Sequence, residues 1–135
     1  MEYQIIDIPK ITDPRGNLAV VEGTTIPFET SRVYYLFDVP SNSRRGGHAH
    51  KQCMELLVPL SGSFTVELYD GTTRKSILLN KPDKGLLIPT MIWRELEDFS
   101  SGAVCLVIAS HKFEEEDYIR DLADFELAAR SKPES

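Results

Sequence analysis

The sequence predicts an all-β fold, a sandwich or small barrel, with one α-helix at the carboxyl end. Short apolar stretches with a period of two, typical of strands, recur from residue 3 to residue 109. Turns rich in glycine and proline separate them at regular intervals. After residue 113 the apolar residues recur at near-helical spacing instead. The 135 residues are expected to form one domain, 1–135, large enough for its own core.

The first third of the chain predicts three strands. Tyr3–Ile8 and Leu18–Glu22 lie on either side of a turn at 13–17, whose sequence is Asp-Pro-Arg-Gly-Asn. Arg32–Val39 is the third strand, and its successive side chains should point to opposite faces. One face would carry Val33, Tyr35 and Phe37, and the other Arg32, Tyr34 and Leu36.

Residues 44–51, Arg-Arg-Gly-Gly-His-Ala-His-Lys, form the only stretch where basic, glycine and histidine residues crowd together. His48 and His50 are two residues apart, so a strand would point both rings to the same face. An inward-facing pair loses its hydration, a cost that metal binding or proton transfer would justify. A solvated basic turn with two incidental histidines is the alternative that the spacing alone leaves open.

Turn residues separate the remaining predicted strands. The dipeptide Asp-Gly at 70–71 predicts a hairpin, and 80–84 is expected to be a loop. Acidic residues favour a helix amino terminus, so the helix is expected at Glu114–Ala129, followed by a frayed tail at 131–135. The strands are expected at Glu55–Leu60, Ser63–Tyr69, Arg74–Leu79, Gly85–Ile88 and Ala103–Ala109.

Composition excludes several classes of function. The net charge of −6 argues against general binding to nucleic acid or anionic membranes, although residues 44–51 could still form a local basic pocket for a phosphorylated ligand. The sequence has no signal peptide pattern and no membrane-length apolar run, so the cytoplasm is the expected compartment. Cys53 and Cys105 belong to no ligand cluster and are expected to be reduced core thiols.

Residues 48–62 resemble the first sequence motif of the cupins, which are small jelly-roll barrels. The matching residues are His48, His50, Glu55 and Gly62. In cupins, the two histidines and the glutamate of this motif bind a metal together with a histidine from a second motif. The resemblance therefore implies a jelly-roll barrel with a site built around the His-rich strand.

The second cupin motif should lie near residues 85–95, where the expected glycine and proline are present. Arg94 stands where the metal-binding histidine would be. A guanidinium has no lone pair for a metal and stays charged, so it would oppose a divalent ion beside it. We therefore expect a barrel without a metal or other cofactor, in which the imidazoles are free for acid–base chemistry.

Six segments in the same order resemble the WxcM-like sugar 3,4-ketoisomerases, cupin enzymes that act on dTDP-4-keto-6-deoxyglucose. The resemblance extends from about residue 5 to about residue 127 and implies an isomerase of deoxy and amino sugar biosynthesis. It also implies a homodimer with exchanged amino-terminal strands, for which Tyr3–Ile8 is the candidate, the alternative being that this segment completes its own sheet. The segments lie at 13–18, 32–35, 45–51, 89–95, 98–100 and 117–120.

Moving a ketone from C4 to C3 requires removal of the C3 proton, an enediol or enediolate, and return of a proton at C4. Groups that titrate near neutrality suit these steps. His50 is the expected carbon base, and His48 the expected shuttle between the two oxygens. Tyr35, matched to the family's active-site tyrosine, would relay protons or polarise an oxygen.

Positive side chains are expected around the nucleotide diphosphate and the sugar oxygens, because the planar arginine fork suits both. The expected binding residues are Arg15, Arg45 and Arg94, with Lys51 and Arg32 behind them. Trp93 is expected to form a pocket wall. Glu55 either orients His50 or faces solvent, and the sequence leaves both open. His111 is expected at the surface.

Other functions remain open at this point. A non-catalytic cupin that binds sugar nucleotides would keep the pocket, but would not need three proton-transfer groups. A metal-dependent cupin enzyme would need a stoichiometric ion. A 4-keto-sugar epimerase would share the fold and the Asp-x-Arg-Gly turn. The sequence also leaves open the configuration at C4 of the product.

Overall fold

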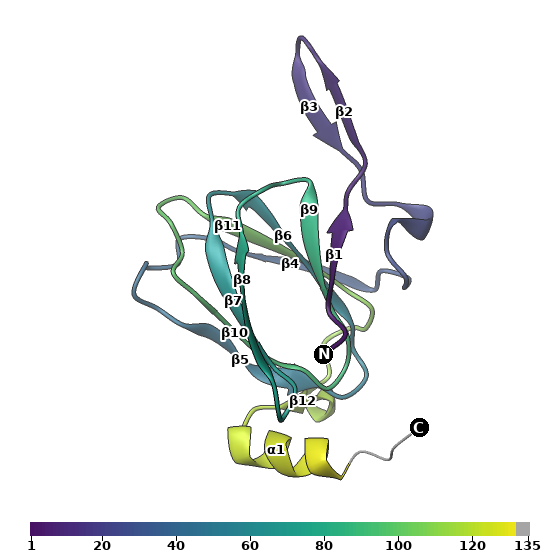
Figure 1. Cartoon of the computed structure of the whole chain (residues 1–135). Helices are drawn as coiled ribbons and strands as arrows, with labels where there is room; N and C mark the ends of the chain where they lie inside the picture. Colours follow the sequence, from purple (N-terminus) through teal and green to yellow (C-terminus); the bar gives the residue numbers. More distant parts are fainter. Residues whose placement is uncertain (132–135) are drawn as a thin grey trace.

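The computed structural model describes residues 1–131, in which two five-stranded antiparallel sheets face each other (Figure 1). The first sheet has the order β1-β9-β6-β11-β4 and the second the order β12-β5-β10-β7-β8. The strands are β1 Gln4–Asp7, β2 Lys10–Asp13, β3 Gly16–Ala19, β4 Arg32–Leu36, β5 Arg45–His50, β6 Glu55–Ser61, β7 Phe64–Tyr69, β8 Arg74–Leu79, β9 Lys84–Ile88, β10 Trp93–Glu97, β11 Val104–Ala109 and β12 Tyr118–Ile119.

Strands β4 to β11 follow the path of a jelly roll. Four of them, β4, β6, β9 and β11, belong to one sheet, and β5, β7, β8 and β10 to the other, so the chain passes repeatedly between the sheets. β1 and β12 extend one edge of each sheet. The all-β fold with a helix at the carboxyl end is confirmed.

The core lies between the two sheets and explains the period-two pattern. On β7, Phe64, Val66 and Leu68 are buried, whereas the alternate residues Thr65 and Glu67 are only partly covered. Burying one such apolar side chain contributes about 1.5–3 kcal/mol. The other sheet supplies the facing layer, with Leu57, Leu86, Cys105 and Val107 among its buried side chains.

Most strands begin and end within one residue of the sequence prediction, and β8 matches it. β4 ends three residues early, at Leu36 instead of Val39. β10 was not predicted as a strand, because charged residues at 94, 95 and 97 obscure its alternation. It lies between β5 and β7, paired with both.

The chain departs from the prediction between residues 8 and 22. β1 pairs with β9 of the same chain, so Tyr3–Ile8 completes its own sheet. Pro9, which has no N–H for a continuing ladder, separates β1 from β2. β2 and β3 then pair with each other as a hairpin that projects away from the sheets (Figure 1). The strand predicted at Leu18–Glu22 ends at Ala19.

The carboxyl-terminal helix is shorter than predicted. The acidic run forms a single 3₁₀ turn, Glu115–Asp117, and β12 then pairs with β5. The helix α1 spans Leu122–Arg130, and the side chain of Asp121 caps it by accepting a hydrogen bond from the Asp124 N–H at 2.9 Å. Apart from Ser131, the predicted tail lies outside the described residues.

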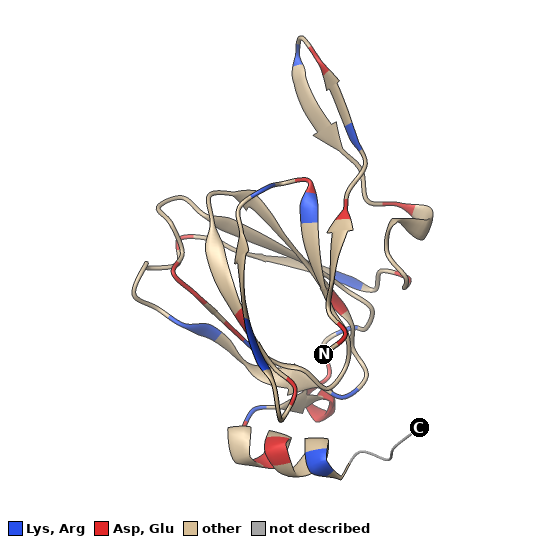
Figure 2. Ribbon diagram, viewed as in Figure 1, with Lys and Arg blue, Asp and Glu red and all other residues tan. Residues whose placement is uncertain are grey.

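Among residues 1–131, no helix combines the length and apolar character needed to cross a membrane. The cytoplasmic location stays a prediction. Cys53 and Cys105 are buried, unbonded thiols, and burial raises the pKa of both. Figure 2 shows acidic and basic residues interspersed over strands, loops and the helix.

Candidate active site

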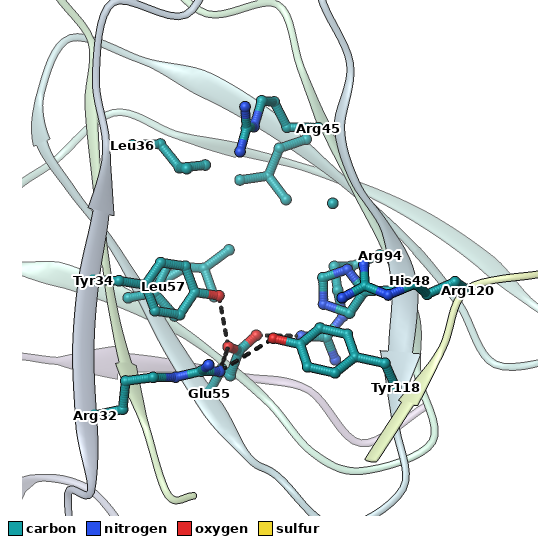
Figure 3. Close-up of a pocket in the computed structure, with 13 residues that line it drawn as sticks. Arg32, Tyr34, Leu36, Arg45, His48, Glu55, Leu57, Arg94, Tyr118 and Arg120 are labelled. Atoms are coloured by element: carbon teal, nitrogen blue, oxygen red, sulfur yellow. Dashed lines mark hydrogen bonds and ion pairs between the residues drawn. The ribbon is translucent and has the colours of Figure 1, made fainter. Parts of the chain in front are cut away.

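A pocket of about 330 Å³ lies between the two sheets and takes residues from both (Figure 3). In the described part of the chain, four arginines line it, although the whole protein carries a net charge of −6. The lining residues are Arg32, Tyr34, Leu36, Arg45, Gly46, His48, Glu55, Leu57, Arg94, Leu96, Val107, Tyr118 and Arg120. The pocket therefore concentrates positive charge where a diphosphate could bind.

β4 turns Tyr34 into this pocket, and Tyr35 away from it. The predicted alternation is correct, but the placement of Tyr35 in the pocket is wrong for this chain, because Tyr35 lies on the outer face and is 61% exposed. The Tyr34 hydroxyl donates a hydrogen bond of 2.7 Å to Glu55 Oε2. Burial, followed by the negative charge of Glu55, raises the pKa of Tyr34. Tyr34 is therefore a neutral phenol at physiological pH.

Glu55 lies at the floor of the pocket and does not face solvent. Its Oε1 accepts a hydrogen bond of 2.6 Å from Arg94 Nη1 and lies 3.5 Å from His50 Nε2. Burial alone would raise the pKa of Glu55, but His50, Arg94 and Tyr34 together lower it to about 2. The buried carboxylate is therefore ionised. Of the two roles expected for Glu55, facing solvent is excluded, and contact with His50 remains.

Arg94 is 1% exposed and is held by Glu55 and by the backbone just before its own strand. Its Nε and Nη2 donate to the Ile92 carbonyl at 3.3 and 3.1 Å. The ligand atoms of His48, His50 and Glu55 lie within 4.8 Å of one another and could by themselves hold a metal ion. However, Arg94 is already paired with the Glu55 carboxylate, and its permanent positive charge would repel a metal ion at this place. Metal independence remains a prediction.

The two histidines contact each other, and only one of them lines the pocket. His48 and His50 have Nε2 atoms 3.1 Å apart, with the ring planes at 86°. His48 lines the pocket, whereas His50 is fully buried behind it, with Nδ1 2.9 Å from Asp117 Oδ2. Burial, then the charge of Arg94, lowers the pKa of His48 to about 3. His48 is therefore a neutral imidazole that a ligand can touch.

Tyr118 and Arg120 line the pocket from the segment that was predicted to be helical. The Tyr118 ring lies 4.4 Å from the His50 ring, centroid to centroid, and its hydroxyl accepts a hydrogen bond of 3.3 Å from Arg32 Nη2. Arg120 stacks on Tyr118 at 4.2 Å and pairs with Glu115. Residues 117–120 are one of the six segments that resemble the family. Because they were predicted to be helical, neither Tyr118 nor Arg120 was expected in the site.

The pocket brings together most of the predicted residues. His48, Arg32, Arg45, Arg94 and Glu55 line it, and His50 lies directly behind His48. Arg32 also approaches Glu55 to 3.9 Å, and its buried Nε has no hydrogen-bond partner among the described residues. The Arg32 guanidinium therefore keeps one N–H without a protein partner in the described part of the chain.

Four predicted residues lie elsewhere. Tyr35 is on the outer face of β4, and Arg15 is at the hairpin tip, where it pairs with Asp13. Lys51 borders a separate small cavity. Trp93 is not a pocket wall, because it packs beside Phe125 of α1 at a ring distance of 5.8 Å. His111 is exposed, as expected.

One known protein family matches almost the whole chain. The family model described as "FdtA: WxcM-like, C-terminal" matches residues 1–130. The chain belongs to this family. The WxcM-like resemblance carried by the six motifs is confirmed.

Individual relatives of this WxcM-like chain are similar over nearly their whole length. TDP-4-oxo-6-deoxy-alpha-D-glucose-3,4-oxoisomerase of Aneurinibacillus thermoaerophilus is 44% identical over 126 residues, 93% of this chain and 91% of the relative. A 3,4-ketoisomerase structure from Helicobacter canadensis has a TM-score of 0.94 at 41% identity, covering 97% of this chain and 99% of the other. QdtA, a sugar 3,4-ketoisomerase from Thermoanaerobacterium thermosaccharolyticum in complex with TDP, has a TM-score of 0.93 at 39% identity, covering 95% and 94%.

Proposed function

We propose that this chain is a 3,4-ketoisomerase of deoxysugar biosynthesis, which moves the ketone of TDP-4-keto-6-deoxyglucose from C4 to C3. The observation that carries the proposal is a neutral, pocket-facing His48 in contact with a second histidine, inside a pocket lined by four arginines. The substrate class comes from the relatives, one of which is named for this conversion and another of which was solved with TDP.

In this proposal His48 is the carbon base, which reverses the order expected from the sequence. A base must come within hydrogen-bond reach of the proton that it removes, and His48 lines the pocket while His50 does not. His48 Nε2 contacts His50, so Nδ1 is the nitrogen that remains for the substrate. A neutral imidazole can accept the C3 proton there and leave an enediolate.

Tyr34 takes the place expected for Tyr35. Its hydroxyl is bonded to the ionised Glu55, so its oxygen can accept a hydrogen bond from a sugar hydroxyl and orient it. Arg94 would stabilise negative charge that develops on the enediolate oxygens, an effect that fixed donors provide at low cost in reorganisation.

The remaining arginines are proposed to bind the nucleotide diphosphate. Arg32, Arg45 and Arg120 lie around the pocket, and Arg32 keeps an unpaired Nε beside it. A diphosphate is best held by at least two such planar donors. Arg15 and Lys51 were also expected to bind the diphosphate, but they do not line the pocket, and Arg120 is added in this proposal.

We also propose a homodimer, joined by a different segment than Tyr3–Ile8. The β2–β3 hairpin projects away from the two sheets (Figure 1). It carries Ile11 and Leu18, which are 62% and 56% exposed. The outer face of the edge strand β4 exposes Val33 and Tyr35. Covering such apolar groups with the partner's hairpin would remove them from water.

The test is to incubate the purified protein with TDP-4-keto-6-deoxyglucose in heavy water and to follow C3, C4 and the product by NMR. Exchange at C3 and a 3-keto product are expected, and the configuration at C4 is read from the same spectra. Binding of TDP with neither exchange nor product would contradict the enzyme proposal and favour a non-catalytic binding cupin.

A further inference from the structure

Two tyrosines line the active pocket, and their hydroxyl protons are bound differently. The Tyr34 hydroxyl donates its proton to Glu55 Oε2 at 2.7 Å. The Tyr118 hydroxyl instead accepts a hydrogen bond of 3.3 Å from Arg32 Nη2, and no acceptor for its own proton lies within hydrogen-bond distance among residues 1–131. A phenol can accept and donate at the same time. Tyr118 is therefore the tyrosine of this pocket whose proton remains for a ligand oxygen.

The charged groups beside the two phenols have opposite signs. The Tyr34 oxygen lies against the ionised Glu55, and burial, followed by that negative charge, raises the pKa of Tyr34. The Tyr118 ring lies 4.2 Å from the guanidinium carbon of Arg120, and its oxygen is bonded to Arg32. Negative charge on the Tyr118 oxygen would therefore meet two cations, whereas negative charge on Tyr34 would meet a carboxylate.

Two carboxylates also lie near Tyr118, and each is close to one of these arginines. Glu55 Oε2 lies 3.9 Å from Arg32 Nη2. Glu115 accepts hydrogen bonds of 2.6 and 3.0 Å from Arg120. Neither carboxylate is hydrogen-bonded to Tyr118 in the described part of the chain. A phenolate at Tyr118 would therefore have guanidinium groups as its direct partners.

Tyr118 also lies beside the proposed carbon base. The ring centroids of Tyr118 and His48 are 5.0 Å apart, and both side chains point into the pocket (Figure 3). They come from neighbouring strands, because β12 pairs with β5. Moving the ketone also requires a proton to pass from the C3 oxygen, O3, to the C4 oxygen, O4. Assigning His48 to the C3 proton leaves this transfer without a group, since the fully buried His50 does not line the pocket.

We propose that Tyr118 is a catalytic residue, the shuttle that carries the proton between the two sugar oxygens. The inference rests on the proposed ketoisomerase function. When His48 Nδ1 takes the C3 proton, the electron pair of the C3–H bond forms the C3=C4 bond, and a pair of the C4 carbonyl moves onto O4. O4 then takes the hydroxyl proton of Tyr118, and the Tyr118 phenolate takes the proton of the O3 hydroxyl.

The second half of the reaction returns both protein groups to their starting states. An electron pair on O3 forms the C3=O bond, and the pair of the C3=C4 bond takes the proton from His48 Nδ1 at C4. His48 is again neutral and Tyr118 again carries a proton, so only the ketone and the hydroxyl have changed places. Arg32 and Arg120 stabilise the charge on Tyr118 in between, and fixed cations do so with little reorganisation.

The first test is Tyr118→Phe, which removes one oxygen and keeps the ring against the two histidines. Turnover of TDP-4-keto-6-deoxyglucose to the 3-keto product, followed by NMR, should fall by about 10²–10⁴-fold. The affinity for TDP, measured by calorimetry, should stay within about tenfold. Tyr3→Phe is the matched control, because Tyr3 does not line the pocket, and it should leave turnover unchanged.

The second test keeps the hydroxyl and changes its acidity. The full-length protein is made with 3-fluorotyrosine at position 118 and, separately, at position 34. Fluorine makes a phenol more acidic, so the proton is lost at a lower pH, and the shuttle needs that proton at the start of each cycle. The alkaline limb of the pH dependence of turnover should therefore move to lower pH for position 118 and stay in place for position 34.

The outcomes separate the shuttle from a structural role and from the proposed function. Near-normal turnover of Tyr118→Phe would overturn the shuttle alone. A limb that stays in place for position 118 would also overturn it, even if Tyr118→Phe loses turnover, because the hydroxyl would then act only through the structure. Absence of any 3-keto product from the wild type would overturn the proposed function and the shuttle together.

Discussion

Strand β5 and the β2–β3 hairpin carry side chains of similar chemistry in very different surroundings. On β5, His48 and His50 are buried, because the strand lies between β10 and β12. On the hairpin, Arg15 pairs with no residue in the described part of the chain except Asp13 of the same turn, and its side chain is 91% exposed. Neighbouring strands therefore fix the orientation and the charge of a buried side chain. An exposed side chain such as that of Arg15 is fixed in this way only when another surface covers it.

The largest expected effect is on β5. His48→Asn removes the only group that we propose to contact the C3 proton, so C3 exchange and turnover should fall by about 10²–10⁴-fold. The affinity for TDP should stay within about tenfold, or ~1.4 kcal/mol, because the arginines that bind the diphosphate remain. Exchange is measured by NMR, and binding by calorimetry.

His111→Asn is the matched control, since His111 is exposed and bonds only to the neighbouring Ser110 among the described residues. It should leave turnover unchanged. Near-normal C3 exchange by the His48 variant would contradict its role as the base. Loss of exchange in the His50→Asn variant alone would restore the order expected from the sequence.

The next effect concerns the fold around Arg94. Arg94→Met would leave the buried Glu55 without its closest cation, and removing one partner of a buried pair costs about 3–5 kcal/mol. Urea unfolding followed by circular dichroism measures this loss. Arg15→Met is the matched control on the hairpin, and its unfolding midpoint should not move. Equal midpoints for the two variants would show that the Arg94–Glu55 pair does not stabilise the fold.

The sequence predicted most of the pocket because its determinants are local. The spacing of His48 and His50 was enough to place both rings on one side of a strand, and the structure brings them into contact. Alternation separated Tyr34 from Tyr35 correctly. It could not show which of the two faces lies inward, because that depends on strand pairing far along the chain. The resemblance to the family selected Tyr35, which is the exposed residue of the two.

What the sequence missed depends on contacts between distant residues. Asp117 lies 67 positions after His50, and its run of acidic neighbours suggested only the first turn of a helix. The segment instead forms β12, because Ile119 is buried beside Ala49 and Phe125. Trp93 was expected to form a pocket wall, but adjacent residues on a strand face opposite sides, and its neighbour Arg94 is the one that lines the pocket.

A smaller effect is the pH dependence of stability. The pKa of His48 is about 3 in the folded chain and 6.5 when unperturbed, so the unfolded chain binds a proton that the folded chain does not. The part of the free energy of unfolding that depends on neutral His48 is therefore fully present above pH 6.5. It is lost as the pH falls toward 3, by at most about 1.4 kcal/mol per pH unit. The stability that comes from ionised Glu55 is lost only at lower pH, as the pH falls from 4.5 toward its folded-state pKa of about 2.

Urea unfolding at several pH values between 6.5 and 4.5 tests this difference. The wild type should lose stability across the window more steeply than the His48→Asn variant. Parallel curves for the two proteins would contradict a buried neutral imidazole at position 48.

The hairpin is tested by its apolar residues. If it covers the partner's β4, replacing Ile11 and Leu18 with aspartate should convert the dimer to a monomer in light scattering at micromolar concentration. Turnover should change less than in the His48 variant, since Ile11 and Leu18 are not among the residues that line the pocket. Deletion of residues 1–8 should instead destabilise the fold by removing β1 from β9. A monomeric, fully active wild type would contradict the dimer.

The smallest expected effect is that of removing metal ions, which should change nothing. His48, His50 and Glu55 are close enough to bind an ion, but Glu55 is already paired with Arg94 at 2.6 Å, and a divalent ion would meet that fixed positive charge. Activity should therefore survive EDTA, and elemental analysis should find no stoichiometric metal. Arg94→His is the reverse test: it removes the cation and adds an imidazole beside the three groups, so it should raise zinc affinity. A wild-type protein that purifies with zinc, iron, manganese or nickel and loses activity with it would show that Arg94 does not exclude the ion.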